Sequence, residues 1–229
     1  MAQAISPAGV QGQRWLAPGV RVGTNAVNPG GRTSLTARIG APGVLLAHGQ
    51  GYPTYKTVAV SRVGSSKPQL VIKADRAEHV NVAAAPQGRL WLMWEQNGTI
   101  YAARTNKAAT RLGAANTLRP PGGGTIYRLN GEGSAGPLDL FANVQSGGQG
   151  LWHQQVLPKL TLVGTRAGSS IVFRVLDAGE PVAGATVKSG GKTLRTNAKG
   201  VATLTQARAG RVKASASKAG YAAAAASVR

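Results

Sequence analysis

Cysteine is absent from this 229-residue sequence, and so are long apolar runs. Without cysteine the chain has no disulfide, no thiolate ligand for a metal and no cysteine nucleophile. No apolar stretch approaches the roughly 18 residues of a membrane-spanning helix, so we expect no membrane span. The opening segment MAQAISPAGVQGQRW lacks the basic and apolar parts of a signal peptide. We therefore expect either a cytoplasmic chain or a mature or truncated piece of a secreted protein.

Acidic residues are scarce: seven Asp and Glu residues stand against 27 Lys and Arg residues, and the formal net charge is +20. Residues 1–164 carry 16 basic and five acidic residues, and residues 165–229 carry 11 and two. Such a balance attracts polyanions, among them nucleic acid, acidic polysaccharide, teichoic-type polymers and anionic lipid headgroups. No run of five basic residues occurs, however, which favours charges scattered over solvated faces. We expect any polyanion binding to be shared among many side chains.

Glycine, proline and short apolar runs are abundant instead, as in GRLWLMWEQNGTIYAAR from Gly88 to Arg104. Leu90–Trp94 is bulky and apolar, and Thr99–Arg104 begins with β-branched and aromatic residues. Asn97 and Gly98 lie between them, and both residue types tolerate the positive φ of a tight turn, which predicts a β-hairpin. No apolar pattern of helical period persists over three turns, so the expected fold class is all-β.

The hairpin pattern recurs about every 45–48 residues. Its apolar runs begin at Val44, Leu90 and Leu138. Such a period, with several strands in each repeat, is typical of a β-propeller blade. We expect a first strand before each hairpin and a fourth strand after two of them: Ser34–Ile39, His79–Ala84 and Thr125–Leu129, then Gln69–Lys73 and Thr110–Leu118.

These strands predict about three four-stranded blades, near residues 33–75, 76–122 and 123–160, in a first unit of residues 1–164. Propellers close with about four to eight blades. The chain is therefore either the C-terminal part of a larger propeller or closes by self-association with another copy.

The segments HVNVAAAPQ and GRLWLMWEQNGTIYAARTN resemble blades of secreted bacterial propellers of the sialidase-like and repeat-propeller class. The resemblance covers roughly residues 33–157. It implies a propeller architecture and an extracellular or cell-surface location, and it implies little about activity because propellers host many functions.

Residues 165–229 follow a different period, with short segments of alternating apolar and polar residues and a turn about every 8–12 residues. This pattern predicts a small β-sandwich. Its boundary with the repeats is expected within residues 158–170. The segments PVAGATV, TNAKG and KAGY resemble the carboxypeptidase regulatory-like, prealbumin-type family, close to bacterial immunoglobulin-like surface modules. That resemblance implies a non-catalytic accessory domain on a secreted protein.

Two glycine motifs and three histidines invite a chemical interpretation. GEGSAG (residues 131–136) matches GxGxxG, but the strand-like LDLFANV follows it, which favours a β-turn loop over a dinucleotide site. Gly190-Gly191-Lys192-Thr193 lacks the first glycine of a phosphate loop and predicts a hairpin turn. His48, His79 and His153 show no metal-ligand spacing. We expect no cofactor and no metal.

Catalytic machinery of the sialidase kind is not visible either, because the S-x-D-x-G-x-x-W turn is missing and carboxylates are few. We therefore expect a non-enzymatic extracellular or cell-surface protein that binds or displays, with a glycan, cell-wall polymer or protein as partner. The alternatives are a C-terminal fragment of a secreted glycosidase-like enzyme and a basic nucleic-acid-binding protein. Sequence-specific nucleic-acid binding is disfavoured, since no helix-turn-helix, zinc pattern or aromatic-basic platform is present.

Ligand-binding residues are expected in the loops between the second and third strands of each repeat, which emerge on one face of a propeller. These loops are residues 48–55, 95–98 and 145–150. Their polar and aromatic residues are candidates for ligand binding: His48, Tyr52, Tyr55, Glu95 and Gln96. The alternative is that these are ordinary solvated turns.

Overall fold

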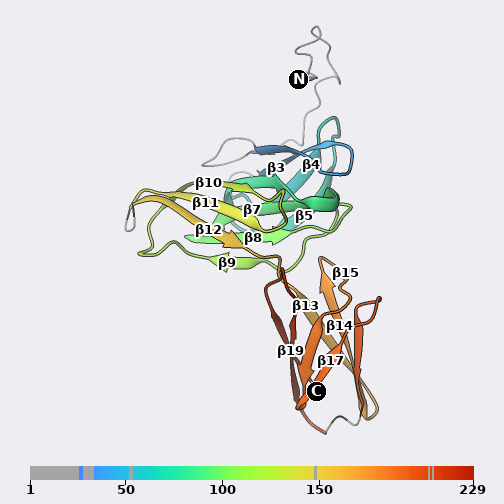
Figure 1. Ribbon diagram of the computed structural model, residues 1–229. Coiled ribbons are helices and arrows are strands. Elements are labelled where there is room, and N and C mark those ends of the chain that lie inside the picture. Colours follow the sequence, from blue (N-terminus) through green and yellow to red (C-terminus); the bar gives the residue numbers. More distant parts are fainter. Residues whose placement is uncertain (1–25, 28–33, 52–53, 147–148, 206, 208) are drawn as a thin grey trace.

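The computed structural model describes residues 26–27, 34–51, 54–146, 149–205, 207 and 209–229. It shows two bodies, one built from blade-like repeats and one from a sandwich of two sheets (Figure 1). Strands make up nearly all of the regular structure, and the described residues contain a single 3-10 turn, Pro86–Gly88. No helix among the described residues is long and apolar enough to cross a membrane. The expectation of an all-β fold is confirmed.

The first body, here called the repeat unit, consists of three antiparallel meanders. The strands of the first are β1 (Ala26–Val27), β2 (Ser34–Ala37), β3 (Val44–Gln50), β4 (Thr57–Arg62) and β5 (Pro68–Lys73). Those of the second are β6 (Glu78–Ala84), β7 (Leu90–Gln96), β8 (Thr99–Arg104) and β9 (Asn116–Leu118). Those of the third are β10 (Ile126–Glu132), β11 (Leu138–Val144) and β12 (Gly150–Val156).

The second repeat has the expected four strands, and the other two repeats have different numbers of strands. In the first sheet, β1 and β2 pair with the same strand, β3, and the sheet has five strands. The third sheet has three, since no described strand follows β12 in it. The fourth strand of the second repeat is shorter than the predicted Thr110–Leu118, because it begins only at Asn116.

The predicted hairpin around Asn97-Gly98 forms as expected. Gln96 pairs with Thr99, and Asn97 and Gly98 have φ of 51° and 73°, so the two central residues both lie in the left-handed region of a two-residue turn. Strand β7 of this hairpin is apolar from Leu90 to Trp94, and these residues are buried on both faces of the sheet. Leu92 and Trp94 pack against the first repeat, and the two residues that alternate with them, Trp91 and Met93, pack against the third.

Trp91 explains one glycine of the GEGSAG segment, in which Gly131 and Glu132 end β10 and the following residues form the turn that leads to β11. The indole Nε1–H donates to the Gly136 carbonyl at 2.9 Å. A Cβ on Gly133 would lie only 2.4 Å from the indole ring, so the loop can cover Trp91 only with glycine at this position.

The first strands of the three repeats lie side by side and are joined by polar side chains. The Ser34 hydroxyl donates to Asn81 Oδ1 at 2.8 Å and accepts the Val82 N–H at 2.9 Å. The Asn81 amide donates to the Leu129 carbonyl at 2.7 Å. These hydrogen bonds thus hold β2, β6 and β10 side by side.

The second body, here called the sandwich unit, has two four-stranded sheets around a core that includes Phe173. One sheet contains β13 (Thr161–Ala167), β14 (Ser170–Asp177), β15 (Glu180–Pro181) and β18 (Val201–Leu204). The other has the order β17 (Lys192–Arg195), β16 (Thr186–Ser189), β19 (Val212–Ser217) and β20 (Ala224–Val228).

The sandwich begins earlier than residue 165, the position expected from sequence. Strand β13 starts at Thr161 and pairs with β14 along its whole length, so residues 168–169 are a hairpin turn within the sandwich and not part of a linker. None of the described sheets contains strands from both units. Lys159 crosses between them, with isolated bridges to Ala114 on one side and Ala222 on the other.

The two units are joined by buried ion pairs. The Asp177 carboxylate lies 2.5 Å from Arg104 Nη2 and 3.3 Å from Arg89 Nη1, and its side chain is only 3% exposed. Glu180 accepts from Arg89 Nη2 and, at 3.1 Å, from the Lys107 N–H. Arg104 also lies over the Tyr221 ring, 5.4 Å from its centroid. Asp177 therefore joins the ends of the β7–β8 hairpin to the sandwich.

Asp177→Asn tests this junction. We expect a loss of about 3–5 kcal/mol in the free energy of unfolding, because the change leaves two buried guanidinium groups without their shared carboxylate. Urea unfolding followed by tryptophan fluorescence measures the effect, since the tryptophans all belong to the part of the chain before the sandwich. Asp139→Asn is the control, because that side chain is 40% exposed. An unchanged midpoint for Asp177→Asn would contradict the assignment.

Candidate functional site

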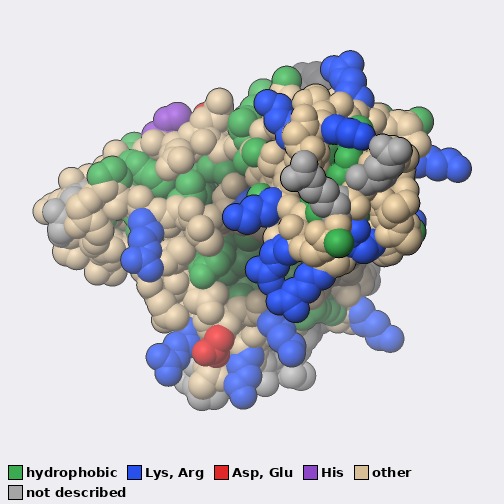
Figure 2. Space-filling view, turned by 90° about the horizontal axis from the view of Figure 1, so that it is seen from below, with side chains coloured by type: hydrophobic (Ala, Val, Ile, Leu, Met, Phe, Trp, Pro, Cys, Tyr) green, Lys and Arg blue, Asp and Glu red, His purple; other side chains and the backbone are tan. Residues whose placement is uncertain are grey.

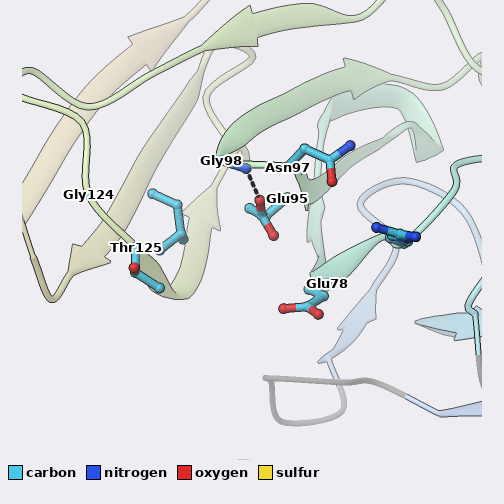
Figure 3. A pocket seen from close by; sticks show the side chains of 8 residues that line it. Glu78, Glu95, Asn97, Gly98, Gly124 and Thr125 are labelled. Atoms are coloured by element: carbon cyan, nitrogen blue, oxygen red, sulfur yellow. Dashed lines mark hydrogen bonds between the residues drawn. The ribbon is translucent and has the colours of Figure 1, made fainter.

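A pocket of about 310 Å³ lies between the second and third repeats (Figure 3). It is formed by the segment before β6, the β7–β8 turn and the segment that leads into β10. Its lining residues are mostly polar or charged: Arg76, Glu78, Glu95, Asn97, Gly98, Gly124, Thr125 and Ile126.

Two carboxylates face this space from neighbouring strands. Glu78 is the register partner of Glu95, and a β-bulge follows Glu78 before pairing resumes at Asn81. Bulges change the direction in which side chains point. Figure 3 shows the carboxylates of Glu78 and Glu95 turned toward the same space, with Thr125 on its other side.

Glu95 is the more buried carboxylate, with 8% of the residue exposed. One of its oxygens accepts the Gly98 N–H, which fixes the side chain against its own turn. Burial raises the pKa of Glu95 above its ordinary value; the Gly98 hydrogen bond opposes the rise in this pKa, and the Glu78 charge adds to it. The two carboxylates therefore differ: Glu78 is exposed to solvent, while Glu95 takes up a proton more readily than a free glutamate.

His79, the residue after Glu78 in β6, has a strained backbone conformation. Its φ is 50°, in the left-handed region that a residue with a Cβ adopts at a cost. It is 7% exposed, and its Nδ1 has no hydrogen-bond partner among the described residues. Strained, incompletely satisfied residues of this kind cluster at functional sites, so His79 supports the assignment of the pocket as one.

The third repeat contributes Thr125, whose position depends on Gly124. A Cβ on Gly124 would lie 1.7 Å from the Ser146 carbonyl oxygen, and φ of 109° at this residue also requires glycine. The Thr125 N–H donates to the Ser146 hydroxyl at 3.2 Å, and the two hydroxyls lie 3.3 Å apart. These contacts place the Thr125 hydroxyl at the pocket wall.

Charges of both signs meet in the pocket, because Arg76 lines it together with the two glutamates. The guanidinium and the Asn97 amide are donors, the carboxylates are acceptors, and the Thr125 hydroxyl is both. Within the described residues, no group of three or more His, Asp or Glu side chains is arranged to hold a metal ion. The pocket therefore offers both donors and acceptors of hydrogen bonds.

The candidate residues from the sequence have different positions in the structure. Glu95 lines the pocket, whereas Gln96 is half-buried at the end of β7 and is not part of the lining. Tyr55 belongs to the first repeat, away from the lining residues, and has φ of 44°. Tyr52 lies outside the described residues.

His48 was expected in a loop, but it lies within strand β3 and is 3% exposed. Its Nε2 lies 3.1 Å from the Ser61 hydroxyl, and burial lowers the pKa of the imidazole. These contacts make His48 part of the sheet, so a solvent-facing role is corrected to a structural one.

Arg76, Glu78 and Thr125 were not among the sequence candidates. They precede or begin the first strands of their repeats, and these segments emerge on the same face as the loops between second and third strands. The repeat period contains this signal, because a loop after the fourth strand must return to that face.

Neither a scan against protein-family models nor a search of curated proteins finds a match to this chain.

The raised pKa of Glu95 makes a prediction about stability. A carboxyl whose pKa is higher in the folded state contributes stability that is present below its unfolded pKa and is lost as pH rises through the folded pKa. Glu95→Gln removes this loss while keeping an oxygen for the Gly98 N–H. We expect the melting temperature of the variant, relative to the original protein, to increase from pH 4 to pH 7.

Glu132→Gln is a control of opposite sign. The Ser134 side chain and N–H hydrogen-bond this exposed carboxylate and lower the pKa of Glu132. Its contribution is present above the unfolded pKa and is lost as pH falls. The Glu132→Gln variant should therefore become relatively less stable from pH 4 to pH 7. Parallel trends in the two variants would refute the interpretation of Glu95.

Proposed function

We propose that this protein is a non-enzymatic binding protein of the cell exterior, and that its repeat unit binds a sugar residue of a glycan in the pocket between the second and third repeats. The observation that carries the proposal is the convergence of two carboxylates, a guanidinium, an amide and a hydroxyl on one cavity.

The chemistry of the wall favours a sugar. Each sugar hydroxyl both donates and accepts hydrogen bonds, and this wall offers acceptors in Glu78 and Glu95 and donors in Arg76 and Asn97. A small number of precisely placed polar groups gives orientation and specificity in ligand sites. At about 310 Å³ the cavity is at the lower end of such sites, which suits one sugar unit.

The scaffold also suits recognition. The lining residues lie on short segments between strands that are held by the buried cores of two neighbouring repeats. Binding residues are commonly placed on such segments of a rigid scaffold. The sandwich unit would act as an accessory module, and the resemblance of both units to modules of secreted proteins supports an extracellular or cell-surface location.

A glycan array with neutral and acidic oligosaccharides tests the pocket. We expect binding of at least one glycan. Glu78→Gln or Thr125→Val should weaken this binding about tenfold or more, because the first change removes a charged hydrogen-bond partner and the second leaves a sugar hydroxyl without its partner. The Asp139→Asn variant should bind normally, because Asp139 lies on β11 and does not line the pocket. Equal binding by all four proteins would remove the pocket from consideration.

Glycoside hydrolysis is a second candidate function, favoured by one observation: a buried carboxyl with a raised pKa faces a solvated carboxylate, as a general acid faces a base or nucleophile. Two observations oppose it. An oxygen of Glu95 is already engaged by the Gly98 N–H, and the sequence lacks the sialidase turn motif.

We expect no hydrolysis of 4-methylumbelliferyl glycosides, a sialoside included, by the purified protein. Fluorescence release over hours measures the activity. Hydrolysis that disappears in both Glu95→Gln and Glu78→Gln would replace the binding role with a catalytic one. Hydrolysis that survives both changes would come from a contaminant and leave the expectation intact.

A further inference from the structure

The fold distributes the carboxylates of the sandwich unit very unevenly. Residues 165–229 contain only Asp177 and Glu180, and both are used in the ion pairs with Arg89 and Arg104. No side-chain carboxylate of this segment remains for the rest of its surface, where the described Lys and Arg side chains lie. Figure 2, which views the molecule from the side of the sandwich, shows many Lys and Arg side chains and few Asp or Glu.

One sheet arranges three of these cations in a line. In the sheet β17-β16-β19-β20, Lys188 of β16 is exposed at the centre, opposite Thr193 of β17 and Ser215 of β19. Arg195 lies two residues beyond Thr193, and Lys213 lies two residues before Ser215. Both are exposed. Because the strands are antiparallel, Arg195 and Lys213 lie diagonally on either side of Lys188, toward opposite ends of the sheet.

The result is a diagonal row, Arg195–Lys188–Lys213, here called the cationic row. Diagonal neighbours on adjacent antiparallel strands are about 7–8 Å apart. The other outward positions around the row carry small side chains, most of them hydroxyls: Thr186, Thr193, Ser215, Ser217, Ala225 and Ser227. The face is flat, cationic and rich in hydroxyl groups.

Three features of this face indicate which class of polyanion it would bind. It carries no aromatic side chain, because Phe173 is in the core and Tyr221 lies against Arg104, so it offers no platform on which bases could stack. It carries no bulky apolar side chain that could insert into a membrane. Its regularly spaced cations and hydroxyls match carboxylate groups and sugar hydroxyls that repeat along a polymer.

We propose that the outer face of the sheet β17-β16-β19-β20 binds an acidic polysaccharide. The carboxylates of the polymer pair with the cationic row, and its sugar hydroxyls hydrogen-bond with the flanking Ser and Thr side chains. This site is separate from the pocket of the repeat unit, and each can exist without the other. The net positive charge is divided almost evenly between the two units, so the sequence alone predicts binding that is shared by both. The proposed contact instead places most of the binding energy on this one sheet.

The test uses the full chain and polygalacturonate in 0.15 M salt, with binding followed by isothermal titration calorimetry. The triple variant Lys188→Gln, Arg195→Gln and Lys213→Gln should bind about tenfold more weakly, the combined effect of three exposed ion pairs. The matched control, Arg174→Gln, Lys192→Gln and Lys199→Gln, removes the same charge from exposed positions of the same unit outside this face. It should bind nearly as tightly as the original protein.

Three results would overturn the proposal. One is equal weakening by the two triple variants, which would assign the attraction to net charge alone. Another is no binding of polygalacturonate by the original protein. The third is tighter binding, at the same salt concentration, to a DNA duplex or to phosphatidylserine vesicles than to polygalacturonate. Thermal melting of both variants confirms that they are folded, since all six positions are exposed.

Discussion

The burial of strand β7 on both faces is the constraint on which the other parts of this structure depend. Trp94 belongs to the core shared with the first repeat and Trp91 to the core shared with the third, so this strand makes three repeats into one body. Arg89 and Arg104, at the open end of the same hairpin, hold the sandwich through Asp177. Glu95, at its closed end, lines the pocket. A slip of one residue in the pairing of β7 would exchange its two faces and displace all of these contacts.

Scarcity of carboxylates gives each one a strong influence on the electrostatics. The two of the sandwich unit neutralise guanidinium groups at the junction, where an unpaired buried charge would be costly. The same pairing leaves the outer surface of the sandwich cationic. In the repeat unit, Glu95 is withdrawn from solvent and Glu78 is exposed. These two carboxylates line the pocket together with Arg76, so the pocket contains side chains of both charge types within a basic protein. Stability of the junction and cationic character of the surface thus have one physical origin.

Local signals were sufficient to predict much of the fold from sequence. The Asn97-Gly98 turn and the periodic apolar runs at Val44, Leu90 and Leu138 predict the hairpins and their order, because turn geometry and side-chain alternation are short-range properties. Of the pocket residues, only Glu95 was among the sequence candidates, since Arg76, Glu78 and Thr125 come from segments that the fold brings to this turn from a distance in sequence. His48 was assigned to a loop because the sequence pattern does not show that strand β3 continues to Gln50 and buries this histidine.

The position of the pocket between repeats has a further consequence. Its two walls belong to different sheets, and their separation is fixed by contacts such as the Asn81 amide to the Leu129 carbonyl and the packing of Gly133 on Trp91. A ligand that contacts both Glu78 and Thr125 therefore binds only when these two repeats are packed together. By mass action such a ligand stabilises the packed state in proportion to the logarithm of its concentration. Substitutions that loosen the repeat interface would then weaken the binding of such a ligand even though they touch no lining residue.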